Sequence, residues 1–214
     1  MNAEATPQYV VLYKPFGVLS QFSEEDGHAG LASLNLGLDP DIYPVGRLDR
    51  DSEGLLLLTN DRSINGALLD PEHGHRRTYW VQVEGEPTEE ELHAFNRPMT
   101  LKIKGRWHST APAEARLLGE APPVPERVPP VRFRKTVPDR WLELVLTEGK
   151  NRQVRKMTAH AGFPTLRLIR VAIGDLNLME LGLQPGEMRA IPRETVLNQL
   201  GLRLTNSRTQ RRQR

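Results

Sequence analysis

A charged loop runs directly into four consecutive leucines, and this junction constrains the fold more than any other stretch of the chain. The loop, residues 46–54, reads GRLDRDSEG, and the leucines occupy residues 55–58. A short apolar run bounded by polar residues predicts a buried strand. Asp49 then lies between two arginines on a loop that is fixed to a sheet, which is a common way for a protein to present a reactive carboxylate.

The complete string of residues 46–61, GRLDRDSEGLLLLTND, is far more specific than an isolated acidic loop, for which turn and cap roles are the default interpretation. It resembles the catalytic motif of the RNA pseudouridine synthases of the ribosomal small-subunit synthase A type, and the resemblance implies that Asp49 is the catalytic aspartate. Ser52 stands where this family usually has threonine, so a hydroxyl is retained.

Three other segments resemble further motifs of the same family. Residues 14–20 (KPFGVLS) form a Pro/Gly turn like the first motif, and residues 77–85 (RTYWVQVEG) alternate like a half-exposed strand. The resemblance implies that Tyr79, in this strand, stacks on the target base. Residues 148–157 (EGKNRQVRKM) resemble the third motif, in which an arginine at the Arg155 position contacts the catalytic aspartate.

Composition narrows the class of protein. The chain of 214 residues is long enough for one domain or for two small lobes packed together. It contains no cysteine, so disulfides, thiolate nucleophiles and cysteine-ligated zinc are excluded, and a reducing cytoplasm is the expected compartment. We expect neither a signal peptide nor a transmembrane helix.

The basic residues are clustered, although the formal net charge is only +2. The first cluster, residues 149–174, contains no acidic residue, and the second lies in the C-terminal tail, residues 205–214. Such clusters can serve solubility alone, but phosphate is the better partner for them. The basic residues are Lys150, Arg152, Arg155, Lys156, Arg167 and Arg170 in the first cluster and Arg208, Arg211, Arg212 and Arg214 in the second.

Hydrophobic periodicity and capping residues predict strands alternating with short helices. A proline-rich arm, residues 121–138, interrupts them, and we expect it to join two lobes. We expect residues 1–8 to be flexible, residues 9–204 to form the catalytic domain and residues 205–214 to be disordered. Besides the leucine run, the expected strands span residues 9–13, 77–85, 141–147, 167–173 and 186–191, and the expected helices span residues 61–69, 151–161 (capped by Asn151) and 195–204, with one more after the capping box of Thr88 and Glu91.

The resemblance covers nearly all of residues 9–200 and implies an α/β (α+β) pseudouridine synthase fold. In this fold a mixed, largely antiparallel sheet forms two packed lobes with flanking helices and a central active-site cleft. The implied activity is cofactor-free isomerisation of uridine to pseudouridine. Residues 78–88 and 140–170 resemble members that act on large-subunit RNA, so 23S ribosomal RNA is the expected partner. We expect no S4 RNA-binding module, which many relatives carry, before Tyr9, and we expect a cytoplasmic monomer that binds no metal and no membrane.

The reaction needs a carboxylate beside the anomeric carbon and a closed pocket that retains the detached base. We expect Asp49 to supply the carboxylate and Arg155 to keep it ionised by lowering its pKa. Arg47 is placed to fill the space left by a flipped nucleotide, and because flipping is easiest in irregular RNA, a loop or bulge is the expected target. Further RNA contacts are expected from Lys14, Arg50, Lys150, Arg152, Arg170 and Lys156, the last of which stands where the family usually has arginine.

Three other functions compete with this hypothesis. A metal-dependent nuclease could use Asp49, Asp51 and Glu53 as oxygen ligands, although the residues between them suit a loop; His73 and His75 are more typical of solvent-facing than of ligating side chains. A noncatalytic ribosome-binding module needs only the basic face and leaves the Asp49 loop unexplained. A glycosidase needs a second carboxylate paired with Asp49, and none is recognisable in the sequence.

Overall fold

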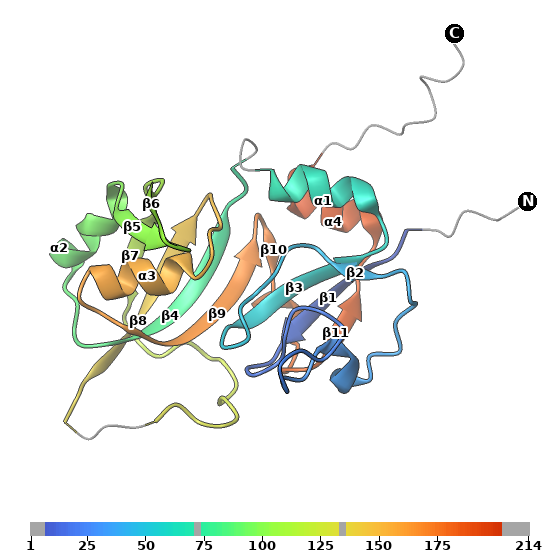
Figure 1. Cartoon of the computed structure of the whole chain (residues 1–214), viewed down its shortest axis with the longest axis horizontal. Helices are drawn as coiled ribbons and strands as arrows, with labels where there is room; N and C mark the ends of the chain where they lie inside the picture. Colours follow the sequence, from blue (N-terminus) through green and yellow to red (C-terminus); the bar gives the residue numbers. More distant parts are fainter. Residues whose placement is uncertain (1–6, 71–73, 133–135, 203–214) are drawn as a thin grey trace, which may run out of the picture.

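The computed structural model describes residues 7–70, 74–132 and 136–202, and a nine-stranded sheet spans this part of the chain (Figure 1). The order across the sheet is β11 (Met188–Ala190), β1 (Tyr9–Lys14), β3 (Glu53–Thr59), β9 (Thr165–Ile173), β4 (Arg77–Glu84), β8 (Asp139–Leu146) and β7 (Glu114–Leu118), while β2 (Tyr43–Pro44) pairs with β3 and β10 (Leu176–Asn177) pairs with β9. Apart from the parallel β3–β9 pair, the described neighbours are antiparallel, so the predicted mixed, largely antiparallel sheet is confirmed.

The β3–β9 contact is a narrow junction between two halves of the sheet. Its register comprises only two pairs, Glu53 with Ile169 and Gly54 with Arg170. Gly54 has φ +109°, and a Cβ atom at this position would lie 2.3 Å from the carbonyl oxygen of Arg170. Glycine therefore permits the approach that joins the halves at the point where the Asp49 loop enters β3.

The first half buries both faces of β3, which explains the unbroken leucine run. Leu55 and Leu57 pack with α1 (Arg62–Leu69) and α4 (Arg193–Gln199), whereas Leu56 and Leu58 face a second core with Leu31 and Ile42. Asp61 caps α1, as predicted, by accepting a hydrogen bond from the backbone N–H of Ser63. Short 3-10 helices complete this half, η1 at Leu31–Leu34 and η4 at Met179–Leu181.

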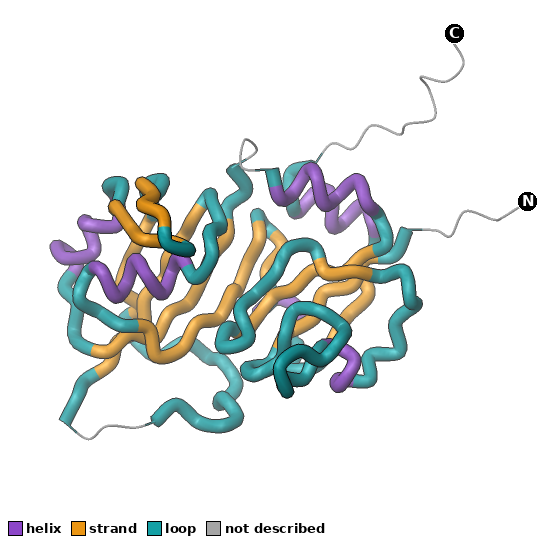
Figure 2. Tube along the Cα trace, in the orientation of Figure 1, coloured by secondary structure: helices purple, strands orange, loops and turns teal. Residues whose placement is uncertain are grey.

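The second half is built on the predicted alternation of β4, whose residues Tyr79, Val81 and Val83 are buried. Its core also receives residues from the small sheet and the helices on that side. Figure 2 shows that the helices lie near the two ends of the large sheet, whereas strands and loops occupy its middle. The additional elements are α2 (Glu89–Leu92), which begins with the predicted capping box, η3 (His93–Asn96), α3 (Gln153–His160), and β5 (Thr100–Ile103) paired with β6 (Arg106–Ser109).

Two sequence predictions about connections are wrong. Asn151 does not cap α3, because the N-cap residue is Arg152 in the left-handed conformation with φ 53°. The proline-rich arm does not join the two halves, because it leaves β7 and returns to the neighbouring strand β8. The arm instead contacts both halves near their junction: the Pro125 carbonyl accepts a hydrogen bond from Arg167 on β9, and the Arg127 guanidinium lies 4.2 Å from the centroid of the ring of Phe16, in the turn after β1.

The predictions for most of residues 1–8 and for the tail, residues 205–214, fall outside the described residues. Within the described part of the chain, no helix is both long and apolar enough to cross a membrane.

Candidate active site

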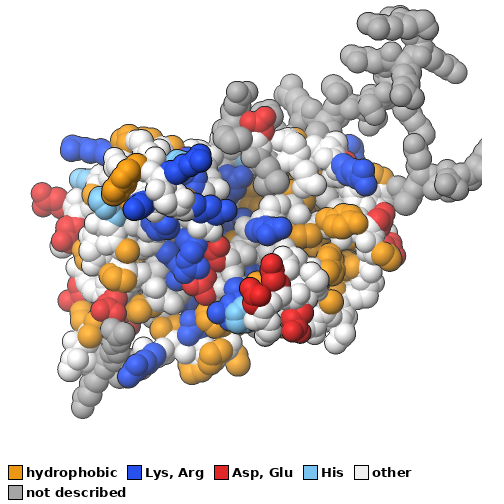
Figure 3. Space-filling model, viewed as in Figure 1, with side chains coloured by type: hydrophobic (Ala, Val, Ile, Leu, Met, Phe, Trp, Pro, Cys, Tyr) orange, Lys and Arg blue, Asp and Glu red, His pale blue; other side chains and the backbone are white. Residues whose placement is uncertain are grey.

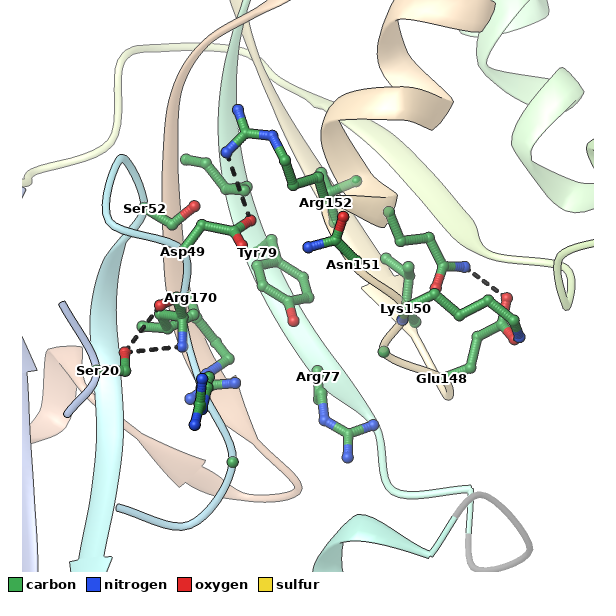
Figure 4. A pocket seen from close by; sticks show the side chains of 18 of the residues that line it. Ser20, Asp49, Ser52, Arg77, Tyr79, Glu148, Lys150, Asn151, Arg152 and Arg170 are labelled. Atoms are coloured by element: carbon green, nitrogen blue, oxygen red, sulfur yellow. Dashed lines mark hydrogen bonds and ion pairs between the residues drawn. The ribbon is translucent and has the colours of Figure 1, made fainter. Parts of the chain in front are cut away.

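A cleft of about 720 Å³ lies at the junction of the two halves and is lined by residues of both (Figure 4). Residues 45–50 and Ser52 form one wall, strand β4 contributes Arg77 and Tyr79, and the segment before α3 contributes residues 146–152. The predicted catalytic loop and the predicted base-stacking tyrosine therefore meet in one cavity, although they are far apart in the sequence.

The Asp49 loop is held by the turn that follows β1. The Ser20 hydroxyl accepts a hydrogen bond from the Leu48 N–H (2.9 Å) and donates one to the Leu48 carbonyl (2.8 Å). The Gly17 N–H donates to the Arg50 carbonyl at 2.8 Å. Hydrogen bonds to the main chain on both sides of Asp49 thus hold the backbone of this residue in place.

Lys14 belongs to this support and not to the RNA surface, which corrects the sequence prediction. It is fully buried, and its Nζ donates to the carbonyls of Pro15 (2.8 Å) and Val18 (2.6 Å). Burial lowers its pKa to about 8, against the opposing charges of Glu53, Asp51 and Asp49. The Nζ of this lysine is surrounded by backbone carbonyls that already accept its hydrogen bonds, so it has no free donor for a phosphate.

Asp49 is partly buried, and its pKa is raised above the ordinary aspartate value. Burial is the largest cause, and the charge of Asp51 adds to it. Arg152, Arg155 and Lys14 act in the opposite direction without reversing the shift. The prediction that a neighbouring arginine would leave this pKa low is therefore wrong, because desolvation outweighs the charge pairing.

Arg155 contacts Asp51 rather than the predicted Asp49. Its Nε lies 3.4 Å from Asp51 Oδ2, and its Nη2 donates to the Asp51 carbonyl at 2.6 Å. Arg152 binds the same carboxylate through two hydrogen bonds, 2.8 and 2.7 Å long, and its Nη1 lies 3.9 Å from Asp49 Oδ2. Because α3 begins only at Gln153, Arg152 lies before the first turn of the helix. Its side chain binds Asp51 in the loop.

Asp51 differs from its neighbour Asp49 in the direction of its pKa shift as well as in its contacts. Burial acts to raise the pKa of Asp51, but the hydrogen bonds from Arg152 and the charge of Arg155 outweigh it and leave the pKa lowered. One loop thus carries an aspartate held firmly ionised by arginines beside another whose charge is only weakly compensated.

Four of the predicted RNA contacts, Arg47, Arg50, Lys150 and Arg152, line the cleft. Lys156 does not line it, since its Nζ donates to the backbone carbonyl of Lys102 at 2.6 Å on the β5–β6 hairpin. Lysine and arginine side chains gather at the centre of the face in Figure 3. Arg170 also lines the cleft but is only 4% exposed.

Sequence reasoning missed two cations of the cleft, Arg77 and Lys104. Arg77 begins the strand that carries Tyr79, and its position two residues earlier on an alternating strand could have indicated the same face. Lys104 lies at the turn of the β5–β6 hairpin, with φ 47°, and no motif marked it.

A family model described as RNA pseudouridylate synthase matches residues 8–160. The chain belongs to this family. It is 54% identical over 169 residues to ribosomal large subunit pseudouridine synthase E of Xanthomonas axonopodis pv. citri, which covers 79% of this chain and 87% of that protein. It is 46% identical over 182 residues to the protein of the same name from Vibrio parahaemolyticus, with 85% and 73% covered. A crystal structure of a pseudouridylate synthase superposes with a TM-score of 0.70 at 26% identity, covering 91% of this chain and 74% of that one.

The chain is therefore an RNA pseudouridine synthase, and the geometry disfavours the competing chemistries. Glu53 is 1% exposed and bound by Arg167, so it does not converge with Asp49 and Asp51 on a common ion. Nowhere in the described residues do three His, Cys, Asp or Glu side chains form a group that could hold a metal ion. Asp51, with its lowered pKa, is unsuited to be the proton-donating partner that a glycosidase needs.

Proposed function

We propose that this enzyme isomerises one uridine of large-subunit, 23S ribosomal RNA to pseudouridine, as a cytoplasmic monomer of the ribosomal small-subunit synthase A type. The observation that carries the proposal is the placement of Asp49 in a cation-lined cleft beside Tyr79. The relatives named for the large ribosomal subunit, which align with most of this chain, support the choice of RNA.

In this proposal the Asp49 carboxylate acts at the anomeric carbon. It either bonds to C1′ or removes the neighbouring proton from C2′, while the electron pair of the C1′–N1 bond leaves with the base. The detached uracil turns, and its C5 forms a bond to C1′; in the first case this breaks the ester bond between C1′ and Asp49, and in the second case Asp49 returns the proton to C2′. C5 then loses a proton and N1 gains one, so the composition is unchanged and Asp49 is again a free carboxylate. Tyr79 stacks on the base, and Arg152 and Arg155 keep the loop in place through Asp51.

The rim of the cleft supplies the contacts to the RNA backbone. Arg47, Arg50 and Arg152 are exposed there, and arginine binds phosphate through paired hydrogen bonds. The volume of about 720 Å³ is enough for one flipped nucleotide. Arg47, on the same loop as Asp49, fills the space that the flipped nucleotide leaves. Because unpairing is least costly in irregular RNA, the target uridine is expected in a loop or bulge.

The decisive experiment maps pseudouridines in ribosomal RNA from a strain that lacks this protein. One pseudouridine in 23S RNA should disappear, and the wild-type gene should restore it whereas an Asp49→Asn gene should not. An unchanged 23S map would refute the proposed substrate. Loss of a site in other RNA would keep the isomerase and change its target.

A chelator tests the nuclease alternative with the purified enzyme. Isomerisation of a 23S fragment should continue in excess EDTA, because the proposed steps use only the side chains of the cleft. A loss that magnesium restores, with the RNA fold intact, would favour metal-dependent chemistry.

A further inference from the structure

Arg170 has a buried guanidinium that interacts with Tyr79, and one of its nitrogens, Nη2, has no hydrogen-bond partner among the described residues. It lies on β9, is 4% exposed, and donates from Nε to the Leu55 carbonyl at 2.9 Å. Its Nη2 is buried, yet Arg170 lines the cleft. A buried donor without a partner is unfavourable, so its retention at a cavity wall indicates a partner that the free protein lacks.

Arg167, on the same strand, is a buried arginine whose contacts serve only the structure. It is 5% exposed, its Nε and Nη2 donate to both carboxylate oxygens of Glu53 at 2.8 and 2.7 Å, and its Nη2 also donates to the Pro125 carbonyl at 2.9 Å. Residues three apart on a strand point to opposite faces. The two arginines are thus equally buried, but only Arg170 faces the cleft and keeps an unused donor.

The sheet places Arg170 between the two groups that handle the substrate. Tyr79 on β4 is its direct cross-strand partner, and directly opposed residues place their side chains on the same face. On its other side, Arg170 is in register with Gly54, five residues after Asp49. Figure 4 shows Asp49, Tyr79 and Arg170 around one part of the cleft.

We propose that Arg170 binds the carbonyl oxygens of the target uracil and stabilises the negative charge that the base carries while it is detached. Breaking the C1′–N1 bond leaves its electron pair on the base, and this charge spreads over N1, O2 and O4. A fixed cation in a site sheltered from water stabilises such an anion strongly, and it needs no proton transfer to do so. The proposal rests on the isomerisation itself and not on which ribosomal RNA carries the uridine.

The symmetry of uracil lets one donor serve both halves of the reaction. A half-turn of the ring about the line through N3 and C6 exchanges N1 with C5, and it exchanges O2 with O4. A donor that binds one carbonyl before the turn therefore meets the other carbonyl, in the same place, after it. Arg170 is anchored at Nε by the Leu55 carbonyl, so its free end can stay in position while the base moves.

The test compares Arg170→Met, Arg170→Lys and the wild type on a ribosomal RNA fragment that contains the uridine lost in the deletion strain. Single-turnover rates at saturating enzyme should fall about 100-fold for the methionine variant and less for the lysine variant. RNA affinity and its salt dependence should stay within about two-fold of wild type, because the guanidinium binds the base. A lost affinity with a flatter salt slope would instead mean a phosphate contact and would overturn the proposal. The deletion strain tests the substrate separately: an unchanged 23S map there would refute the substrate choice, whereas equal rates for the wild type and Arg170→Met on its true substrate would refute the role of Arg170.

Thermal unfolding separates this role from a structural one. Arg170→Met should keep or raise the melting temperature, because it removes an unpaired buried cation, whereas the matched variant Arg167→Met should lower it, because it leaves Glu53 buried alone. Lower stability of Arg170→Met that accounts for its lost activity would contradict the proposal.

A better leaving group tests the charge directly. Fluorine at C5 withdraws electrons and helps uracil to hold a negative charge, so cleavage of 5-fluorouridine should depend less on Arg170. The rate ratio of wild type to Arg170→Met, followed by the loss of intact 5-fluorouridine from nuclease digests, should shrink several-fold relative to uridine. An unchanged ratio, or no cleavage by the wild type, would contradict charge stabilisation by Arg170.

Discussion

Two arginine–carboxylate pairs join the halves of the molecule at the start of β3, with the same bond lengths and very different surroundings. Arg167 holds Glu53 through bonds of 2.8 and 2.7 Å, and Arg152 holds Asp51 through bonds of 2.8 and 2.7 Å. The side chains of the first pair are 6% and 2% exposed, whereas those of the second are 42% and 29% exposed. The enclosed pair holds the two halves together at the junction, and the open pair lies at the cleft, which Arg152 lines.

The difference teaches that bond lengths do not reveal the role of an ion pair. In the enclosed pair each charge depends on the other, since water cannot replace a lost partner. In the open pair the carboxylate keeps access to solvent, and Arg152 also extends toward Asp49 at 3.9 Å. Two properties distinguish a pair that holds the halves together from a pair at the cleft: the burial of its side chains and the other groups that its arginine contacts.

Asp49→Asn should have the largest effect on activity and almost none on stability. The amide removes the reactive carboxylate, so single-turnover isomerisation should fall by about 10⁴-fold or more, while RNA affinity stays within a few-fold. Because the folded-state pKa of Asp49 is raised, its ionisation destabilises the fold at pH values above that pKa. The asparagine variant should therefore unfold at pH 7 with equal or higher free energy, measured by urea titration. Turnover near the wild-type rate would refute the catalytic role.

Glu53→Gln should, in contrast, have its main effect on stability. It leaves Arg167 buried without its charged partner, which destabilises a fold by about 3–5 kcal/mol. Chemical denaturation measures this loss, and the double variant Glu53→Leu with Arg167→Met should recover most of it. A Glu53→Gln protein as stable as the wild type would show that the enclosed pair does not fasten the junction.

The sequence predicted the sheet better than the contacts of the site. The leucine run, the alternation around Val81 and the capping box at Thr88 are local patterns, and the structure confirms each of them. The partner of Arg155 depends on where α3 begins, and that depends on the left-handed conformation of Arg152, which no local pattern indicates.

The same limit applies to the two buried cations near the cleft. Lys14 and Arg170 resembled surface charges in a basic chain, but the turn after β1 encloses one and the β4–β9 pairing encloses the other. Burial of this kind is set by strands distant in sequence. Tertiary pairing therefore decided these roles, and residue type alone could not.

Arg152→Gln tests how strongly the open pair controls Asp49. Removing this cation withdraws a charge that opposes the raised pKa, so the pKa of Asp49 should rise further. The reaction needs the ionised carboxylate, so activity is lost as the pH falls through this pKa, and the acid limb of the pH–rate profile should move to higher pH by about one unit. Arg155→Gln should move it less, because Arg155 has the smaller effect on Asp49. An acid limb unmoved by Arg152→Gln would mean that this limb reports another group.

The smallest effect is expected at a third bidentate pair, on the open surface. Arg76 binds Glu114 through two bonds of 2.7 Å, but the two side chains are 54% and 68% exposed. Water screens such a pair and takes over its hydrogen bonds when one partner is removed, so Glu114→Gln should change the free energy of unfolding by less than about 1 kcal/mol. Urea denaturation of Glu114→Gln beside Glu53→Gln gives a matched comparison, because both change a glutamate in a bidentate pair to its amide. If the two variants lost the same stability, burial would not be what separates these pairs, and the distinction between the enclosed and the open pair would fail.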